Sequence, residues 1–234
     1  MSKRPTETDY LPSGTEKARV VRAMFDRIAA RYDLVNRVMT LGMDVGWRRR
    51  AVSELRLPGG ALVADLACGT GDLCNELLSS GYRAIGFDFS HGMLSNATTP
   101  APVVEADVLR LPAADATFDG ATCGFALRNV ADLSPLFAET ARVVRPGGRV
   151  VFLETSEPGG RLMRAGHAAY FRHIVPLIGG LLSDAAAYRY LPRSTAYLPP
   201  PGDLLRMLEE TGFPDAERIQ LSGGVAQLLV GSRR

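Results

Sequence analysis

The stretch DLACGTGDL, residues 65–73, has the composition of a ligand-binding turn between a strand and a helix. Glycines in such a turn let a ligand lie against the backbone, so Gly69 and Gly71 predict a nucleoside site. The dinucleotide fingerprint G-x-G-x-x-G/A requires a small third residue where this chain has Cys74. The carboxylate of Asp65 would repel a pyrophosphate but attract a sulfonium group. The turn therefore predicts S-adenosylmethionine, and not NAD, as the cofactor.

Two further carboxylates end later apolar runs. Asp88 ends RAIGFD (83–88), 19 residues after Gly69, where an acidic residue can accept both ribose hydroxyls. Asp107 ends PVVEAD (102–107) and is expected to meet the adenine amino group. Taken singly, each is better explained as a solvated carboxylate at a strand end. Because parallel strands end at the same edge of a sheet, all of these carboxylates together predict one cofactor crevice.

The elements that must position these residues form an alternating pattern from residue 61 onward. Seven runs read as strands: 61–66, 83–88, 102–107, 118–124, 149–155, 216–221 and 225–231. Helical patterns between them predict an α/β fold with a doubly wound, mostly parallel sheet. The short SGG link before the last run predicts a closing antiparallel hairpin.

A single domain is expected over residues 17–234, after a flexible tail at 1–16. Apolar residues recur at helical spacing over 17–37, which predicts an amphipathic helix. An aromatic, proline-rich stretch at 160–200 interrupts the strand–helix rhythm. The two segments 17–56 and 160–200 are therefore expected to form a helical cap over the crevice.

Composition limits the functions that the chain can have. It is 46% hydrophobic and 22% charged, with a net charge of +2, which is ordinary for a globular protein and gives no argument for nucleic-acid binding. Residues 1–56 carry 12 Lys and Arg against 7 Asp and Glu, a net +5, whereas the remainder is −3. This basic segment suits contact with anionic lipid or is simply a solvated helix face.

Cysteine usage and hydropathy predict a cytoplasmic protein. The three cysteines show neither CxxC nor metal-ligand spacing, so no metal site is expected. The amino-terminal residues lack the apolar core of a signal peptide. The most membrane-like stretch, HIVPLIGGLLS at 173–183, is well short of the ~20 residues that a spanning helix needs.

A closer resemblance rests on longer motifs. They are MFDRIAARYDLVNRVMTLGMDVGWRRR (24–50), LACGTGDL, FDFSHGML, LPAADATFDGATCGFALRNVADL (111–133) and ARVVRPGGRVVFLETSEP (141–158). With them the chain resembles the ubiquinone/menaquinone biosynthesis C-methyltransferase family. The resemblance implies a Rossmann-like class I methyltransferase that methylates a ring carbon of a prenylated hydroquinone, first of all demethylmenaquinol. It also implies cofactor contacts by Thr70, Asp88, Asp107 and Val108.

The cap carries the expected acceptor contacts and some departures from the family pattern. Tyr32, Tyr188 and Tyr190 are candidate substrate-binding residues, although the aromatic residues of the insertion are equally well explained as core packing. The departures from the usual residues are Thr40, Asp44, Arg193, Ala196, Leu229 and Ser232. Since these positions are expected near the acceptor, the identity and tail length of the quinol stay open.

Arg128 and Asn129, in FALRNV, are the candidate catalytic residues. A ring carbon attacks a methyl group only when an adjacent phenol, which titrates near ~10, is ionised or hydrogen-bonded. The guanidinium of Arg128 would lower the pKa of that phenol. The alternative is a surface ion pair of Arg128 with Asp132 or Asp119. Asn129 is expected to orient Arg128 or the substrate, and no strong general base is visible.

Two other functions stay open from the sequence. One is methylation, on carbon or oxygen, of another phenolic or natural-product acceptor. The other is a catalytically silent scaffold that binds the cofactor. A small-molecule quinol is the expected partner, while peripheral contact with the inner face of the membrane and a homodimer remain open.

Overall fold

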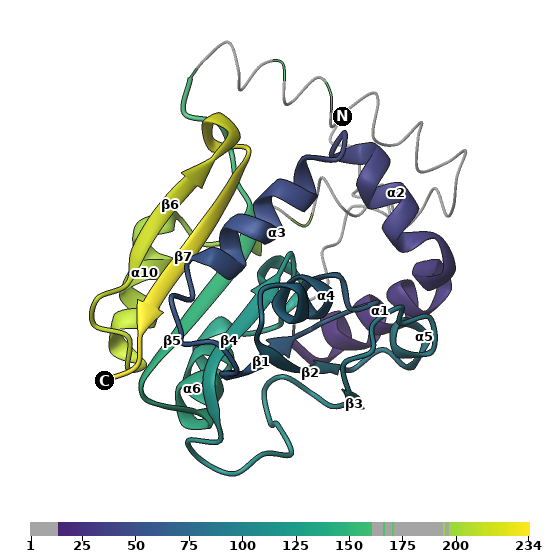
Figure 1. The fold of residues 1–234 in the computed structure, drawn as a ribbon. Helices are drawn as coiled ribbons and strands as arrows, with labels where there is room; N and C mark the ends of the chain where they lie inside the picture. The colour runs from purple at the N-terminus through teal and green to yellow at the C-terminus, as the bar shows by residue number, and fades with distance from the viewer. Residues whose placement is uncertain (1–13, 161–165, 167–169, 171–193, 195–196) are drawn as a thin grey trace.

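The computed structural model describes residues 14–160, 166, 170, 194 and 197–234. A central sheet carries helices on both faces, and the first helices lie beside one end of it (Figure 1). Most of the expected tail and most of the insertion at 160–200 fall outside the described residues. The same holds for Tyr188 and Tyr190, so their contact with the substrate remains a prediction.

Among the described residues the sheet has seven strands, as the sequence predicts. They are β1 (Leu62–Leu66), β2 (Arg83–Asp88), β3 (Val103–Glu105), β4 (Phe118–Gly124), β5 (Val144–Thr155), β6 (Glu217–Leu221) and β7 (Ala226–Ser232). Their order is β3-β2-β1-β4-β5-β7-β6. The first five strands in this order are parallel, and β7 is antiparallel to both β5 and β6. The predicted closing hairpin is confirmed.

The strand order fixes where a ligand can bind. β1 pairs with β2 on one side and with β4 on the other, so the winding of the chain reverses there. In open α/β sheets the crevice lies beyond the carboxyl ends of the strands at this reversal. The glycine turn directly follows β1 and therefore occupies that place.

Helices bury the two faces of the sheet in separate clusters. The helices α3 (Met43–Ser53) and α4 (Asp72–Ser79) pack Trp47 and Leu77 on one face. On the other face, α6 (Leu133–Val143) and α10 (Pro201–Glu210) pack Phe137 and Leu208. Strand residues alternate between the clusters: Phe152 points to the second face and Leu153 to the first. Because both faces of the sheet are buried, residues 150–153 of β5 form an uninterrupted apolar run.

The prediction of one continuous helix over 17–37 is wrong. The chain forms α1 (Gly14–Ile28), a 3₁₀ turn at Ala29–Arg31 and then α2 (Tyr32–Met39), so the expected tail also loses its last residues to α1. The ring of Tyr32 packs edge-on against that of Phe25, with 5.8 Å between the centroids. Together with α5 (His91–Ser95), these helices bury a third cluster around Met24, Val35 and Met93. Tertiary packing thus bends a segment whose hydrophobic spacing suits one helix.

Candidate active site

The two glycines of the turn serve different purposes. Both have positive φ angles, +57° at Gly69 and +93° at Gly71, which favour glycine. A Cβ on Gly71 would lie 2.5 Å from Cγ2 of Thr99, whereas one on Gly69 would meet no atom within 4 Å. Packing therefore requires Gly71, while Gly69 leaves the turn open toward a ligand.

Asp88 fastens this turn to the end of β2. Its buried carboxylate accepts hydrogen bonds from the backbone amides of Gly69 and Ser90, both at 2.8 Å. Burial raises the pKa of Asp88, while these amide donors oppose that rise. The backbone amide of Phe89 is a third donor, and because a carboxylate offers about four lone-pair sites, Asp88 can hold the turn and still accept a ligand hydroxyl.

Asp65 is more deeply buried than Asp88, the other carboxylate bonded near the turn. It is fully buried, and it accepts hydrogen bonds from the hydroxyl of Thr122 at 2.8 Å and the thiol of Cys74 at 3.4 Å. Burial raises the pKa of Asp65 to about 7, against the lowering effect of both hydrogen bonds. A carboxyl of this kind changes charge near neutral pH.

A large cleft opens beside the glycine turn. It opens to solvent, and its lining is mostly apolar with a few polar side chains, which is typical of a site for a small organic ligand. Of the predicted site residues, the cleft brings together Tyr32, Gly69, Asp88, Asp107, Val108 and Asn129. A smaller cavity borders the same turn and is lined by Asp65 and Thr70, as well as by Tyr32 and Gly69. The two cavities thus meet along the turn and Tyr32.

The cap helix α2 contacts the turn directly. The hydroxyl of Thr70 donates to Asp33 at 2.5 Å. Tyr32, the neighbour of Asp33, lines both cavities, and burial raises the pKa of its hydroxyl while the charges of Arg128 and Arg48 oppose that rise. A protonated Tyr32 can donate a hydrogen bond to a ligand in the cleft.

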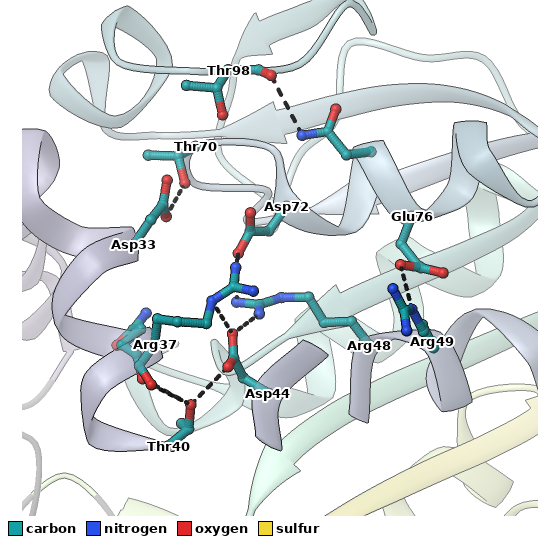
Figure 2. Close-up of polar contacts among 12 residues, drawn as sticks. Asp33, Arg37, Thr40, Asp44, Arg48, Arg49, Thr70, Asp72, Glu76 and Thr98 are labelled. Carbon is teal, nitrogen blue, oxygen red and sulfur yellow. Dashed lines mark hydrogen bonds and ion pairs between the residues drawn. The ribbon is translucent and has the colours of Figure 1, made fainter. Parts of the chain in front are cut away.

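A network of charged side chains joins the cap to the start of α4 (Figure 2). Arg48 pairs with the buried carboxylate of Asp44 and lies 3.1 Å from that of Asp72, and Arg37 reaches the same two carboxylates. The hydroxyl of Thr40 donates to Asp44 at 2.7 Å. Thr40 and Asp44, both departures from the family pattern, therefore bond to one another and support this network.

Arg128 is placed differently from either sequence-based alternative. It lies in the 3₁₀ turn η3 (Leu127–Asn129), and its buried guanidinium pairs with the fully buried carboxylate of Glu154 on β5. The expected surface partners are engaged elsewhere, since Asp132 caps α6 and Asp119 pairs with Arg145 at 2.8 Å. The surface ion pair is therefore wrong. Arg128 does not line the cleft, although its charge reaches Tyr32, which does.

Asn129 has a buried side-chain oxygen that no other described residue satisfies. The residue is 8% exposed, and its amide nitrogen donates to the carbonyl of Phe125 at 3.3 Å. Its Oδ1 is buried and has no hydrogen-bond partner among the described residues. Buried polar atoms in native proteins almost always have a partner, protein or water, so this oxygen is a candidate acceptor for a water or a ligand hydroxyl at the cleft.

Some predicted positions lie away from the cleft. Leu229 is buried in the sheet opposite Phe152, and Ser232 accepts a hydrogen bond from Arg149. Because β7 is antiparallel, Ser232 lies at the sheet edge opposite the cleft. The expectation that Leu229 and Ser232 approach the acceptor is wrong. Arg193 and Ala196 lie outside the described residues.

Sequence reasoning missed several residues of the site. Glu154 stands as a lone charge in the apolar run VVFLET, which is a signal for a buried partner. Phe89 and Met93, which line the cleft, belong to the quoted motif FDFSHGML but carry no chemical signal of their own. In the described part of the chain, no helix has the length and apolarity to cross a bilayer, and no cluster of metal-ligating side chains occurs.

Relatives with similar sequences are methyltransferases. The model of the ubiE/COQ5 methyltransferase family matches residues 13–233. The chain is 43% identical over 229 residues to a demethylmenaquinone methyltransferase of Deinococcus radiodurans, covering 94% of this chain and 95% of that protein. It is 42% identical over 221 residues to the ubiquinone/menaquinone biosynthesis C-methyltransferase UbiE of Syntrophotalea carbinolica, covering 91% and 93%.

Solved structures share the fold at low sequence identity. A possible histamine N-methyltransferase from Thermotoga maritima superposes with a TM-score of 0.64 at 18% identity, over 92% of this chain and all of that one (100%). Phosphoethanolamine N-methyltransferase 2 of Haemonchus contortus, in complex with S-adenosyl-L-methionine, gives a TM-score of 0.61 at 13% identity, over 80% of this chain and 52% of that one. These likenesses establish the class I methyltransferase fold and nothing finer.

Proposed function

The chain belongs to the ubiE/COQ5 methyltransferase family, and on this premise we propose that it methylates a ring carbon of a prenylated quinol, with demethylmenaquinol as the first candidate. It is a methyltransferase that uses S-adenosylmethionine. The observation that carries the acceptor proposal is the partnerless, buried Oδ1 of Asn129, a residue that lines the same cleft as Gly69 of the glycine turn. A ring hydroxyl is the kind of donor that this oxygen lacks.

The residues of the cleft suit this cofactor. Gly69 leaves room against the backbone, and Asp88 keeps lone pairs for ribose hydroxyls. Asp107 and Val108 line the part of the cleft that follows β3, where adenine is expected. Asp65 and Thr70 line the smaller cavity on the other side of the turn, and Gly71 belongs to the turn itself. All three are proposed cofactor contacts. When bound, the cofactor supplies an electrophilic methyl group.

The chain's own residues would prepare the acceptor. Asn129 accepts a hydrogen bond from one ring hydroxyl of the quinol and so fixes the ring, which contributes to the rate by orientation. The guanidinium of Arg128, held in its buried pair with Glu154, favours ionisation of the other ring hydroxyl, although the carboxylate of Glu154 offsets part of its charge. Tyr32 donates a hydrogen bond from the cap side of the cleft. Tyr188 and Tyr190 remain proposed contacts of the acceptor.

The test is incubation of the purified protein with labelled S-adenosylmethionine and a panel of acceptors. The panel holds demethylmenaquinols of different tail lengths, a ubiquinol precursor and simple phenols. We expect a carbon-methylated quinol, identified by mass spectrometry. An oxygen-methylated product, or turnover of simple phenols alone, would point to another acceptor, and cofactor binding without any product would favour the scaffold.

We also propose that the protein works at the cytoplasmic face of the membrane, where a prenylated quinol resides. Leu34 and Leu41, at the α2 end of the cap, are 57% and 75% exposed, and Met43 is exposed beside them. The amino-terminal segment 1–56, to which these residues belong in the sequence, carries a net +5, which favours anionic lipid. The three free cysteines suit a reducing compartment. The homodimer that the sequence leaves open can be tested by sedimentation.

Vesicle flotation tests this surface. The wild-type protein is expected to float with phosphatidylglycerol vesicles and much less with phosphatidylcholine vesicles. The double variant Leu34→Ser/Leu41→Ser should lose most of that binding and keep its affinity for S-adenosylhomocysteine. Equal flotation of the variant and the wild type would contradict the assignment of this surface.

A further inference from the structure

Lys17 is a buried cation that the chemistry described so far does not use. Its residue is 3% exposed, although it lies in the first turns of α1. Its ammonium donates to the backbone carbonyl of Val130 at 2.7 Å and lies 3.8 Å from the centre of the Tyr197 ring. No carboxylate of the described residues pairs with it. Burying a charge in this way is costly, so the position calls for an explanation.

The contacts of Lys17 join two walls of the cleft. α1 forms one wall through Ala18 and Val21, the first of which directly follows Lys17 in the sequence. The segment after η3 forms another wall through Asn129 and Val130. The bond from Lys17 to Val130 therefore ties the cap helix to the residue next to Asn129, whose Oδ1 lacks a partner.

We propose that Lys17 is a positioning residue for methyl transfer, which clamps α1 onto the carbonyl of Val130 and so holds Asn129 toward the acceptor. The inference rests on the proposed role of Asn129. Gly69 and Asp88, the proposed cofactor contacts, bond to each other at the ends of β1 and β2, and neither bonds to Lys17 or to Val130. Loss of the clamp is therefore expected to affect turnover and to spare cofactor affinity.

The charge of Lys17 gives the clamp a pH dependence. Burial lowers the pKa of Lys17 to about 8. A neutral amine still donates to Val130 but loses its attraction to the ring of Tyr197. From the segment before α10, the titratable side chain that faces Lys17 is Tyr197. On the side of η3, the charged side chains are Arg128 and Glu154, which pair with each other. The clamp should weaken as the pH rises through about 8.

The test compares Lys17→Met, Lys17→Arg and the control Arg19→Met, which removes an exposed cation from the same helix. Lys17→Met should lower kcat about 10- to 100-fold, the usual worth of a charged hydrogen bond, with the Kd for S-adenosylhomocysteine changed less than about twofold. Lys17→Arg should keep a larger share of kcat, and Arg19→Met should keep all of it. Wild-type kcat in Lys17→Met, or a parallel loss of cofactor affinity, would overturn the proposal.

Two further measurements distinguish a positioning role of Lys17 from a loss of stability, and they do not depend on how the acceptor ionises or on which acceptor is used. The ratio of wild-type to Lys17→Arg kcat cancels the ionisation of the acceptor, and it should fall as the pH rises through about 8, because a guanidinium stays charged. Hydrogen exchange needs no acceptor at all. With S-adenosylhomocysteine bound, the amides of residues 126–131 should exchange faster in Lys17→Met, while those of 69–71 stay unchanged. A flat ratio, or unaltered exchange at 126–131, would refute the clamp even if no quinol proved active.

Discussion

Arg128 and Glu154 form an ion pair that the protein buries beneath the cleft, between a 3₁₀ turn and the neighbouring strand β5. We expect Glu154→Ala to lower the free energy of unfolding by about 3–5 kcal/mol, because Arg128 would keep a buried charge without a partner. Urea unfolding followed by circular dichroism measures this loss. Asp115→Ala is the control: its ion pair with Arg142 is solvent-exposed on the acidic side (81%), so it should cost about 1 kcal/mol or less.

Removing both charges separates stability from chemistry. The double variant Arg128→Met/Glu154→Leu should regain much of the stability that either single change loses, since apolar residues can replace a buried pair. Its turnover should stay far below wild type and rise with pH, because solvent then ionises the phenol, whose pKa is ~10. Steady-state rates across pH decide the matter. Normal turnover of this variant at neutral pH would remove Arg128 from the mechanism.

Asp88→Ala should weaken binding of S-adenosylhomocysteine about 10- to 100-fold, because a charged acceptor is worth about 1.5–3 kcal/mol. The amide of Gly69 also loses its partner in this variant, so the turn should loosen as well. Isothermal titration calorimetry measures the affinity. Asp107→Ala, at an exposed position of the same cleft, is expected to have a smaller effect. Unchanged affinity in Asp88→Ala would place the ribose elsewhere.

The two glycines of the turn should respond differently to alanine. Gly69→Ala should fold with a loss of about 1–2 kcal/mol from its positive φ, but its methyl group would enter the cleft and weaken cofactor binding. Gly71→Ala meets the side chain of Thr99 and should lose a further ~1–3 kcal/mol from overpacking. Adding Thr99→Ala to Gly71→Ala should restore part of that stability. Equal stabilities of Gly69→Ala and Gly71→Ala would contradict this distinction.

The buried carboxyl of Asp65 predicts opposite pH effects on folding and on cofactor binding. Its pKa is raised to about 7 in the folded protein, against ~3.9 in an unfolded chain. The folded state therefore binds the proton more tightly, and stability should fall as the pH rises from about 4 through about 7. Asp65→Asn should flatten this part of the stability profile, as measured by urea unfolding at several pH values.

Cofactor affinity should move the other way with pH. A cationic sulfonium favours the ionised form of Asp65, so S-adenosylmethionine should bind more tightly as the pH rises through about 7 and release protons on binding. S-adenosylhomocysteine, which lacks the positive sulfur, is the matched ligand and should respond less. Calorimetry in buffers of different ionisation enthalpy measures the protons released. Identical pH profiles for the two ligands would separate Asp65 from the sulfonium.

The parts of the structure that sequence predicts are those that local patterns encode. The alternation of apolar runs with helical patterns predicts the seven strands and the closing hairpin. The glycine turn and the spacing after it predict where Asp88 lies. Pairings between distant segments escape such reasoning. Arg128 finds Glu154 26 residues further on, and Lys17 finds Val130 113 residues away. No spacing rule links such residues, because the packing of α1, η3 and β5 in the folded protein brings them together.

The direction of β7 has a practical consequence for handling the protein. Because that strand runs against β5, the residues after it return to the amino-terminal end of β5, where Arg233 bonds to Gly148 and Arg234 to Gly212. This edge lies opposite the cleft, and the C label of Figure 1 stands well away from α1. A linker attached after Arg234 would thus anchor the protein to a sensor chip or bead with its cleft and the exposed leucines of the cap facing outward, free to meet a supported lipid layer.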